Sequence, residues 1–180
     1  MNKNVDFLPI NISIVTISDT RNLENDKSGD VLIQRVENAG HKVLSRKIVK
    51  DDFHQISKLF QYLINDNNID VIISTGGTGL TGRDITPEVM ETLFEKSIDG
   101  FGEMFRWLSF SKIGTSALQS RALAGVTKGT YIFCLPGSPS ACKDGWDQIL
   151  VHQLDIRHKP CNFVEIMPRL QEHEASRTKS

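Results

Sequence analysis

The chain has 180 residues, a usual length for one domain that buries about 70% of the surface of its unfolded chain. Hydrophobic residues make up 39% and charged residues 24%, which excludes collagen-like, low-complexity and wholly disordered proteins. With 21 basic and 22 acidic side chains the formal net charge is −1, so the basic surplus of a nucleic-acid binder is missing and a small-molecule ligand is expected.

The sequence contains no signal for a membrane or for export. Its longest uninterrupted apolar run, Tyr131–Leu135, is far shorter than the ~18 residues that span a bilayer, and no small-residue cleavage site follows the N-terminal segment. Cys134, Cys142 and Cys161 are odd in number and lack CxxC spacing, which argues against a disulfide framework or a zinc knuckle. We therefore expect a cytoplasmic protein that binds neither membrane nor nucleic acid.

Segments rich in β-branched residues alternate along the chain with segments whose apolar residues recur every three or four positions. This alternation predicts an α/β fold, with a parallel or mostly parallel sheet and helices on both faces. Strands are expected at residues 11–18, 41–49, 71–74 and 130–135. Caps for the helices are expected at Ser28, Asp52 and Thr86, and a helical stripe of Phe101, Met104, Phe105 and Leu108 is expected in the core.

Ligands of such sheets bind beyond the carboxyl ends of the strands. The loops after Ser18, Val49, Ser74 and Leu135 are therefore expected to converge. These four loops contain almost all the candidate functional residues.

The most informative loop is residues 74–88, STGGTGLTGRDITPE. Four glycines within Gly76–Gly82 free the backbone to bring its N–H groups close to an anion, which predicts a phosphate cradle. A Walker A loop is excluded because Arg83 and Asp84 stand where Lys and Ser or Thr are required. A dinucleotide-binding loop is disfavoured because no helix is expected before Pro87.

Asp84 follows this cradle directly. A carboxylate beside a polyphosphate is repelled unless a divalent cation lies between them, so Asp84 predicts Mg²⁺ bound through phosphate oxygens. The alternative is that Asp84 pairs with Arg83 or caps a turn.

A second carboxylate, Asp51, follows the second predicted strand. Because Asp52 suffices as the cap of the next helix, Asp51 is left free to face the crevice.

Other polar residues flank the same edge of the sheet. Asp19, Thr20 and the segment 26–29 could bind polar ligand edges, although turn formation alone also explains them. Ser138 or Ser140 could offer a hydroxyl and helix-start amides to an anion, or serve only as a helix cap.

The residues Gly76-Gly77-Thr78-Gly79, Arg83-Asp84 and Thr86-Pro87-Glu88 fill every fixed position of GGTGxxxRDxTPE, and the chain thereby resembles the MoaB/Mog molybdopterin-adenylyltransferase family. The likeness runs from about Ile12 to Phe163. It implies a three-layer αβα fold of Rossmann-like topology, a single domain at 1–168, and a homotrimer or homohexamer. Residues 169–180 lack apolar periodicity and carry mixed charge, so a flexible tail is expected there rather than a binding arm.

The resemblance also implies an activity, the Mg²⁺-dependent adenylylation of molybdopterin by ATP, in a pathway shared with other molybdenum cofactor enzymes. Asp51 and Asp84 resemble the functional aspartates, and Ser138 resembles a pterin-side contact. The ending Lys159–Phe163 looks like the MoaB branch, and the retained Arg83-Asp84 pair favours an active enzyme. The alternatives are a non-catalytic carrier of molybdopterin or nucleotide, and an interaction module whose loop binds a peptide. The full set of expected ligand-binding residues is Asp19, Thr20, Ser28, Gly76, Gly77, Thr78, Gly79, Arg83 and Ser138, with Asp51 and Asp84 as catalytic residues.

Overall fold

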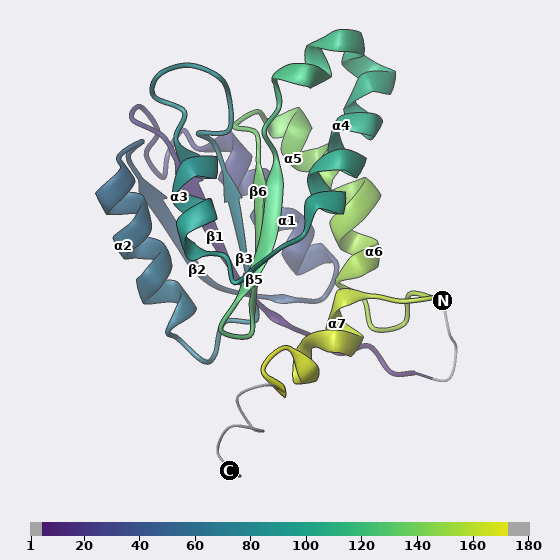
Figure 1. The fold of residues 1–180 in the computed structure, drawn as a ribbon. Helices are drawn as coiled ribbons and strands as arrows, with labels where there is room; N and C mark the ends of the chain where they lie inside the picture. The colour runs from purple at the N-terminus through teal and green to yellow at the C-terminus, as the bar shows by residue number, and fades with distance from the viewer. Residues whose placement is uncertain (1–4, 173–180) are drawn as a thin grey trace.

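A computed structural model describes residues 5–172, which contain a six-stranded sheet of order β2-β1-β3-β6-β5-β4 (Figure 1). The neighbouring strands β2, β1, β3 and β6 are parallel, while β5 is antiparallel to both β6 and β4. The strands are β1 (Asn11–Ile17), β2 (Lys42–Val49), β3 (Val71–Thr75), β4 (Lys96–Ser97), β5 (Leu123–Thr127) and β6 (Thr130–Leu135).

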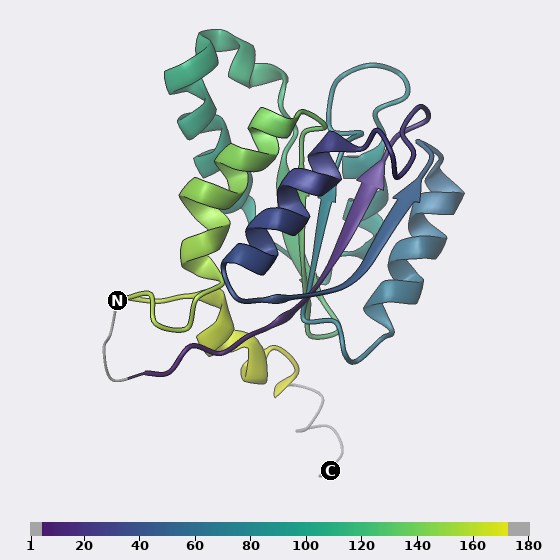
Figure 2. The ribbon, with the colours of Figure 1, turned by 180° about the vertical axis from the view of Figure 1, so that it is seen from behind.

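Helices cover both faces of this sheet (Figures 1 and 2). The helices are α1 (Lys27–Asn38), α2 (Phe53–Ile64), α3 (Thr86–Leu93), α4 (Asp99–Ile113), α5 (Pro139–Gly145), α6 (Val151–Gln153) and α7 (Phe163–Ile166). Shorter turns are η1 (Gly114–Gln119), a π-helical turn η2 (Trp146–Leu150) and η3 (Met167–Arg169). None of the helices within residues 5–172 is long and apolar enough to cross a membrane.

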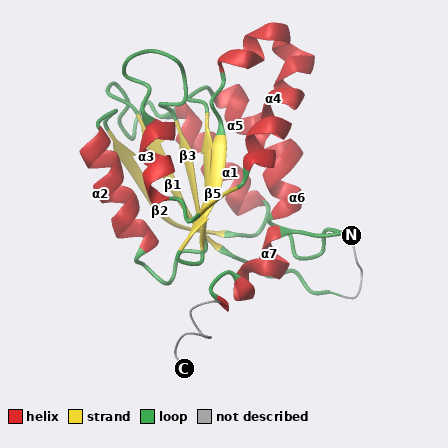
Figure 3. Ribbon diagram, viewed as in Figure 1, coloured by secondary structure: helices red, strands yellow, loops and turns green. Residues whose placement is uncertain are grey.

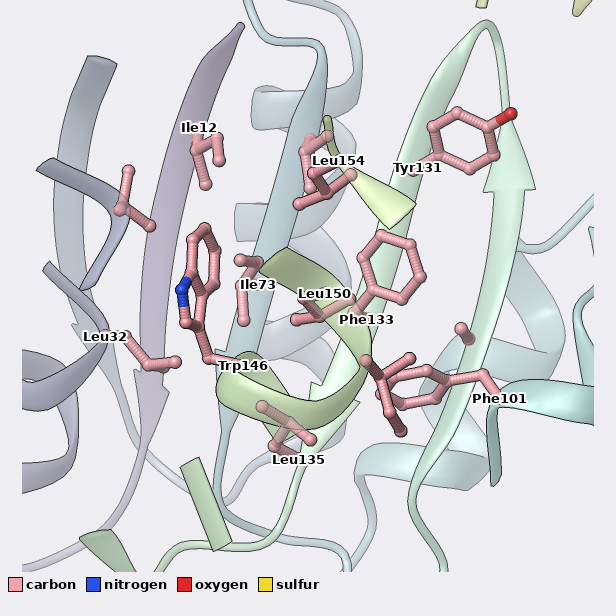
Figure 4. Packing of buried hydrophobic residues seen from close by; sticks show 14 of the residues in the cluster. Ile12, Leu32, Ile73, Phe101, Tyr131, Phe133, Leu135, Trp146, Leu150 and Leu154 are labelled. Atoms are coloured by element: carbon pink, nitrogen blue, oxygen red, sulfur yellow. The ribbon is translucent and has the colours of Figure 1, made fainter. Parts of the chain in front are cut away.

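Successive side chains of the buried strands point to opposite faces of the sheet and belong to two separate hydrophobic clusters. In β3, Ile73 joins a cluster with α1, α4 and α5, whereas Ile72 joins the cluster beneath α2 and α3. The first cluster is built around Trp146 and Phe133, both nearly inaccessible to water (Figure 4). Burying one such large side chain stabilises the fold by roughly 1.5–3 kcal/mol. The predicted three-layer α/β fold is therefore confirmed.

The four predicted strands and the cap at Asp52 are confirmed, since the Asp52 carboxylate accepts a hydrogen bond from Gln55 N at 2.9 Å. The strands β4 and β5 were not predicted, because Lys96–Ser97 is very short and LAGVT carries small residues without a clear alternation. A tight turn joins β5 to β6, with positive φ at Lys128 and Gly129.

Two predicted helix caps are wrong. Asp26, rather than Ser28, caps α1 by accepting a hydrogen bond from Gly29 N, and the Ser28 hydroxyl instead donates to Gly137 O at 2.8 Å. Helix α3 begins after Ile85 without a side-chain cap, because the Thr86 hydroxyl donates to Gly76 O. In both places a distant carbonyl competes for the hydroxyl.

The predicted core stripe on α4 is correct in part. Phe101 and Phe105 are buried and Leu108 packs partly against the same cluster, but Met104 is 50% exposed, so its placement in the core is wrong. The predicted boundary at residue 168 falls within η3, and residues 173–180 of the predicted tail lie outside the described part of the chain.

Candidate functional site

A cleft of about 830 Å³ opens where the loops after β1, β3 and β6 meet, at the edge drawn uppermost in Figure 3. The fourth predicted loop joins them, because Ser18 N donates to Val49 O at 2.8 Å. Parallel strands end at one edge of their sheet, which brings these loops together. The expected convergence of the loops is confirmed.

The glycine loop forms the floor of the cleft. Gly76 and Gly77 have φ values of 107° and 64°, a region that L side chains rarely adopt. A β-carbon on Gly76 would collide with the carbonyl oxygen of Ile17, so β1 and the loop approach each other too closely for any other residue. Gly76 N donates to Leu135 O at 3.0 Å, which ties the loop to β6 as well.

The N–H groups of Gly77 and Thr78 are free for a ligand. Among residues 5–172 neither group donates a hydrogen bond, although both residues line the cleft. Unpaired backbone N–H groups next to a cavity form a ready site for an anion. The loop therefore has the geometry expected of a phosphate cradle.

Asp84 lines the cleft beside these amides. Its carboxylate accepts hydrogen bonds from Thr81 N at 2.8 Å and from Thr81 Oγ1 at 2.7 Å. Partial burial on its own would raise the pKa of Asp84, but the hydrogen bonds from Thr81 lower this pKa below its ordinary value. Asp84 thus caps a turn, as the alternative interpretation allowed, and remains an ionised group at the cleft.

Arg83 does not pair with Asp84. Its guanidinium lies 3.1 Å from the carboxylate of Asp19, and its side chain is 78% exposed. Arg83 points away from the floor of the cleft and forms a bridge between the glycine loop and the loop after β1.

Asp51 lies beside the glycine loop, with its Oδ1 atom close to Gly77. Burial, followed by the negative charges of Asp19 and Asp84, raises the pKa of the Asp51 carboxyl group. The charges of Asp19 and Asp84 therefore both act on the carboxyl group of Asp51 beside the cradle.

The sequence and the solved structures of other proteins place this chain in a family. The family model described as "Probable molybdopterin binding domain" matches residues 13–156. Molybdenum cofactor biosynthesis protein B of Escherichia coli (strain K12) is 46% identical over 158 residues, which cover 88% of this chain and 93% of that protein. The chain belongs to the MoaB/Mog family of molybdenum cofactor biosynthesis proteins.

Solved structures agree with this MoaB/Mog assignment. A crystal structure of a molybdenum cofactor biosynthesis protein B has a TM-score of 0.82 and 37% identity, covering 92% of this chain and 98% of that chain. The tungsten cofactor synthesizing protein MoaB from Pyrococcus furiosus has a TM-score of 0.70 and 34% identity, covering 79% and 91% of the two chains. The resemblance inferred from the glycine-loop residues is confirmed.

One wall of the cleft in this MoaB/Mog chain comes from residues that sequence reasoning missed. Helix α4 and turn η1 contribute Phe105, Ser109, Lys112, Ile113, Gln119 and Ser120 to the lining. Lys112 forms an ion pair with Asp144 of α5, and both side chains line the cleft. The apolar spacing of α4 indicated a helix that packs in the core, so its residues were not predicted to line a cleft. The polar Ser109, which lies between Phe105 and Ile113, was the one sign in the sequence that this face meets a cavity.

The segment 26–29 has a mainly structural role. The carboxylate of Asp26 accepts a hydrogen bond from Thr16 Oγ1 at 2.7 Å and forms an ion pair with Arg46 at 2.9 Å. Ser138 caps α5 by accepting a hydrogen bond from Ala141 N, and it also borders the cleft.

The predicted site residues therefore fall into two groups. Those that line the cleft are Thr20, Ser28, Gly76, Gly77, Thr78, Gly79, Asp84 and Ser138. Asp19, Asp51 and Arg83 stand beside the glycine loop without lining the same cavity, and Asp19 borders a smaller adjoining cavity.

Proposed function

We propose that this chain adenylylates molybdopterin with ATP, in a reaction that depends on Mg²⁺. The observation that carries the proposal is the pair of unengaged N–H groups, on Gly77 and Thr78, at the floor of a large cleft beside an ionised Asp84. These donors suit a polyphosphate, and family membership makes a pterin the expected second ligand.

The proposed reaction is a nucleotidyl transfer. An oxygen of the terminal phosphate of molybdopterin attacks the α-phosphorus of ATP, the bond between that phosphorus and the α,β-bridging oxygen breaks, and pyrophosphate leaves. The products are adenylyl-molybdopterin and pyrophosphate. Because the attacking oxygen is already anionic, positioning and charge neutralisation suffice and no activated side-chain nucleophile is needed.

The residues present fit a magnesium ion that is shared with the substrate. Within residues 5–172, no three His, Cys, Asp or Glu side chains are close enough together to hold a metal ion on their own. Mg²⁺ is commonly bound by one or two carboxylates together with phosphate oxygens, and the carboxylates of Asp51, near Gly77, and Asp84, near Gly79, would be available to hold it. When bound, the ion would neutralise phosphate charge.

The protein groups then have separate tasks in this proposal. The amides of Gly77 and Thr78 orient the phosphates, Asp84 holds the ion against them, and the α4 wall excludes water from one side. In this proposal Ser138 is the pterin-side contact that the resemblance implies, and Thr20 and Ser28 contact the ligands from the cleft lining. Asp19 and Arg83 would act on the ligands from beside the glycine loop.

We also propose that the chain works as a homotrimer or homohexamer in the cytoplasm, alongside the other enzymes of the pathway. Large apolar side chains are exposed on α4 and η1: Met104, Trp107, Phe110, Ile113 and Leu118, with exposed fractions from 50% to 79%. Figure 1 shows the C-terminal part of α4 rising above the loops at the carboxyl edge of the sheet. Large exposed apolar side chains gathered on neighbouring elements are typical of an interface.

A pyrophosphate-release assay tests the proposed reaction. The protein is incubated with molybdopterin, ATP and Mg²⁺, and pyrophosphate together with adenylyl-molybdopterin is measured. Release that requires all three components supports the enzyme, whereas binding of ATP and molybdopterin without release supports the alternative, a non-catalytic carrier. A thermal shift with Mg²⁺ and ATP separates both from a peptide-binding module, because a ligand of the folded state must raise its stability.

A further inference from the structure

The carbonyl oxygens of Gly76 to Gly79 all accept hydrogen bonds, whereas the amides of Gly77 and Thr78 have no partner within residues 5–172. Thr86 Oγ1 donates to Gly76 O and Thr86 N donates to Gly77 O, both at 3.0 Å. Arg121 N donates to Thr78 O at 3.0 Å and Arg121 Nε donates to Gly79 O at 2.7 Å. Two residues thus hold four consecutive carbonyl groups.

A trans peptide unit points its C=O and its following N–H in opposite directions. A donor that fixes the carbonyl of one residue therefore also fixes the direction of the next residue's amide. Thr86 accordingly orients the N–H groups of Gly77 and Thr78, which are the amides without a partner within residues 5–172. Arg121 orients the N–H groups of Gly79 and Leu80 in the same way.

Arg121 also holds the far end of the loop. Its Nη2 donates to Asp84 O at 2.8 Å, while its Nη1 pairs with the carboxylate of Glu88 on α3. The hydrogen bond from Arg121 lowers the pKa of Glu88, so the Glu88 carboxylate stays ionised and keeps its ion pair with Arg121. The guanidinium therefore connects both ends of the loop that carries Asp84 to helix α3.

Neither the Arg121 nor the Glu88 side chain is part of the cleft lining, whereas the neighbouring Ser120 is. Thr86 is completely buried. Thr86 and Arg121 therefore contact the carbonyl groups of the loop without lining the cleft themselves.

We propose that Thr86 and Arg121 are the positioning residues of the cradle, which turn the loop amides toward the cleft by holding its carbonyl groups on the opposite side. This inference rests on the proposed function for its ligand, a polyphosphate. Its structural part concerns the ligand-free protein and can be tested separately.

The test compares Arg121→Gln with Arg35→Gln. Arg35 is a matched control, because it is 20% exposed against 28% for Arg121 and is paired with the half-exposed Asp147 of η2, away from the loop. The readouts are backbone amide chemical shifts and hydrogen exchange of the ligand-free ¹⁵N-labelled proteins, followed by titration with pyrophosphate and with Mg²⁺ and ATP.

Arg121→Gln removes the side-chain hydrogen bond to Gly79 O but keeps the backbone N–H that donates to Thr78 O, so we expect the amide signal of Leu80 to change most. The binding of Mg²⁺ and ATP should weaken about tenfold or more. Arg35→Gln should leave both readouts as in the wild type, whatever its melting temperature. The inference would be overturned if Arg121→Gln kept the loop amide signals and the ligand affinity of the wild type. A lower melting temperature of this variant, without those two changes, would show only that Arg121 stabilises the fold.

Thr86→Val provides a second variant in case Arg121→Gln does not fold. It removes the hydroxyl bond to Gly76 O while keeping the shape of the side chain and its N–H, so the amide of Gly77 should be the one most affected. An unchanged Gly77 amide would contradict the inference. If wild-type protein responds to neither pyrophosphate nor Mg²⁺ and ATP, the proposed function fails, and the ligand-free amides still decide the positioning role.

Discussion

Asp51 lies directly beside Gly77: its Oδ1 atom is 2.9 Å from the position that a β-carbon on Gly77 would occupy. The same β-carbon would collide with the hydroxyl of Thr86, and the φ of 64° at Gly77 disfavours any side chain. The carboxylate and the cradle are therefore packed together through a position that only glycine can fill.

Gly77→Ala is expected to remove nucleotide binding and to destabilise the fold by about 1–3 kcal/mol, because the loop must shift away from both Asp51 and Thr86. Calorimetric titration with Mg²⁺ and ATP and thermal unfolding are the measurements. Gly82→Ala is the control within the same loop, since a β-carbon there would meet no atom within 4 Å. Equal effects of the two substitutions would contradict the role given to Gly77.

Asp84→Asn should keep ATP binding while lowering pyrophosphate release about 100-fold or more, because the carboxylate charge is lost beside the phosphates. The asparagine oxygen can still accept the hydrogen bonds from Thr81, so the turn is expected to persist. Asp66→Asn is a suitable control, since Asp66 also closes a turn, by accepting a hydrogen bond from Asn68 N, but at the end of α2 remote from the cleft. Wild-type turnover in Asp84→Asn would exclude Asp84 as a catalytic residue.

Asp51→Asn is expected to make the ligand-free protein slightly more stable near pH 7, by less than about 3 °C in melting temperature. The pKa of Asp51 is raised in the folded state by burial and by the charges of Asp19 and Asp84. A raised folded pKa means that stability is lost as the pH rises through it, and the uncharged asparagine avoids this loss.

The advantage of Asp51→Asn should shrink as the pH falls toward the ordinary pKa of an aspartate, about 3.9, where Asp51 is protonated in both states. Melting curves between pH 4.5 and 8 in metal-free buffer, at roughly physiological ionic strength, measure this trend. A difference that does not vary with pH would show that repulsion among these carboxylates is not the cause.

Trp107→Glu should reduce the proposed oligomer to a smaller species, because Trp107 is 73% exposed among the apolar side chains of α4 and η1 and a charge there opposes its burial. Light scattering coupled to gel filtration gives the mass directly. Tyr62→Glu, at a 68% exposed aromatic residue on α2, is the matched control and should leave the mass unchanged. If both variants keep the wild-type mass, α4 and η1 do not form the interface.

Much of the fold and of the site was predictable because its determinants are local. The apolar runs at 11–18, 71–74 and 130–135 form strands in almost any α/β context, and Asp52 caps its helix through a residue only three positions away. The glycines of the loop can adopt positive φ because they lack a β-carbon, and this is evident from the sequence. These features needed no knowledge of distant partners.

The two mistaken helix caps involve a competing hydrogen-bond partner outside the helix. The hydroxyl of Ser28 meets the carbonyl of Gly137, 109 residues away, and the hydroxyl of Thr86 meets Gly76 O, so neither caps its helix. Met104 has the spacing of a core residue, yet the turn of α4 against the sheet leaves it exposed. Side-chain hydrogen bonds of this kind are decided by packing.

The sequence alone determines that this protein is an α/β chain with a glycine loop and neighbouring acidic residues at the carboxyl edge of the sheet. These features are predictable because strand patterns, helix periods and the backbone preferences of glycine each depend on only a few neighbouring residues. Only the tertiary structure shows that the α4 wall closes the cleft and that Arg121 holds the carbonyl of Gly79, 42 residues away. Contacts across such separations depend on how whole helices and strands pack, and that packing is a property of the folded chain as a whole.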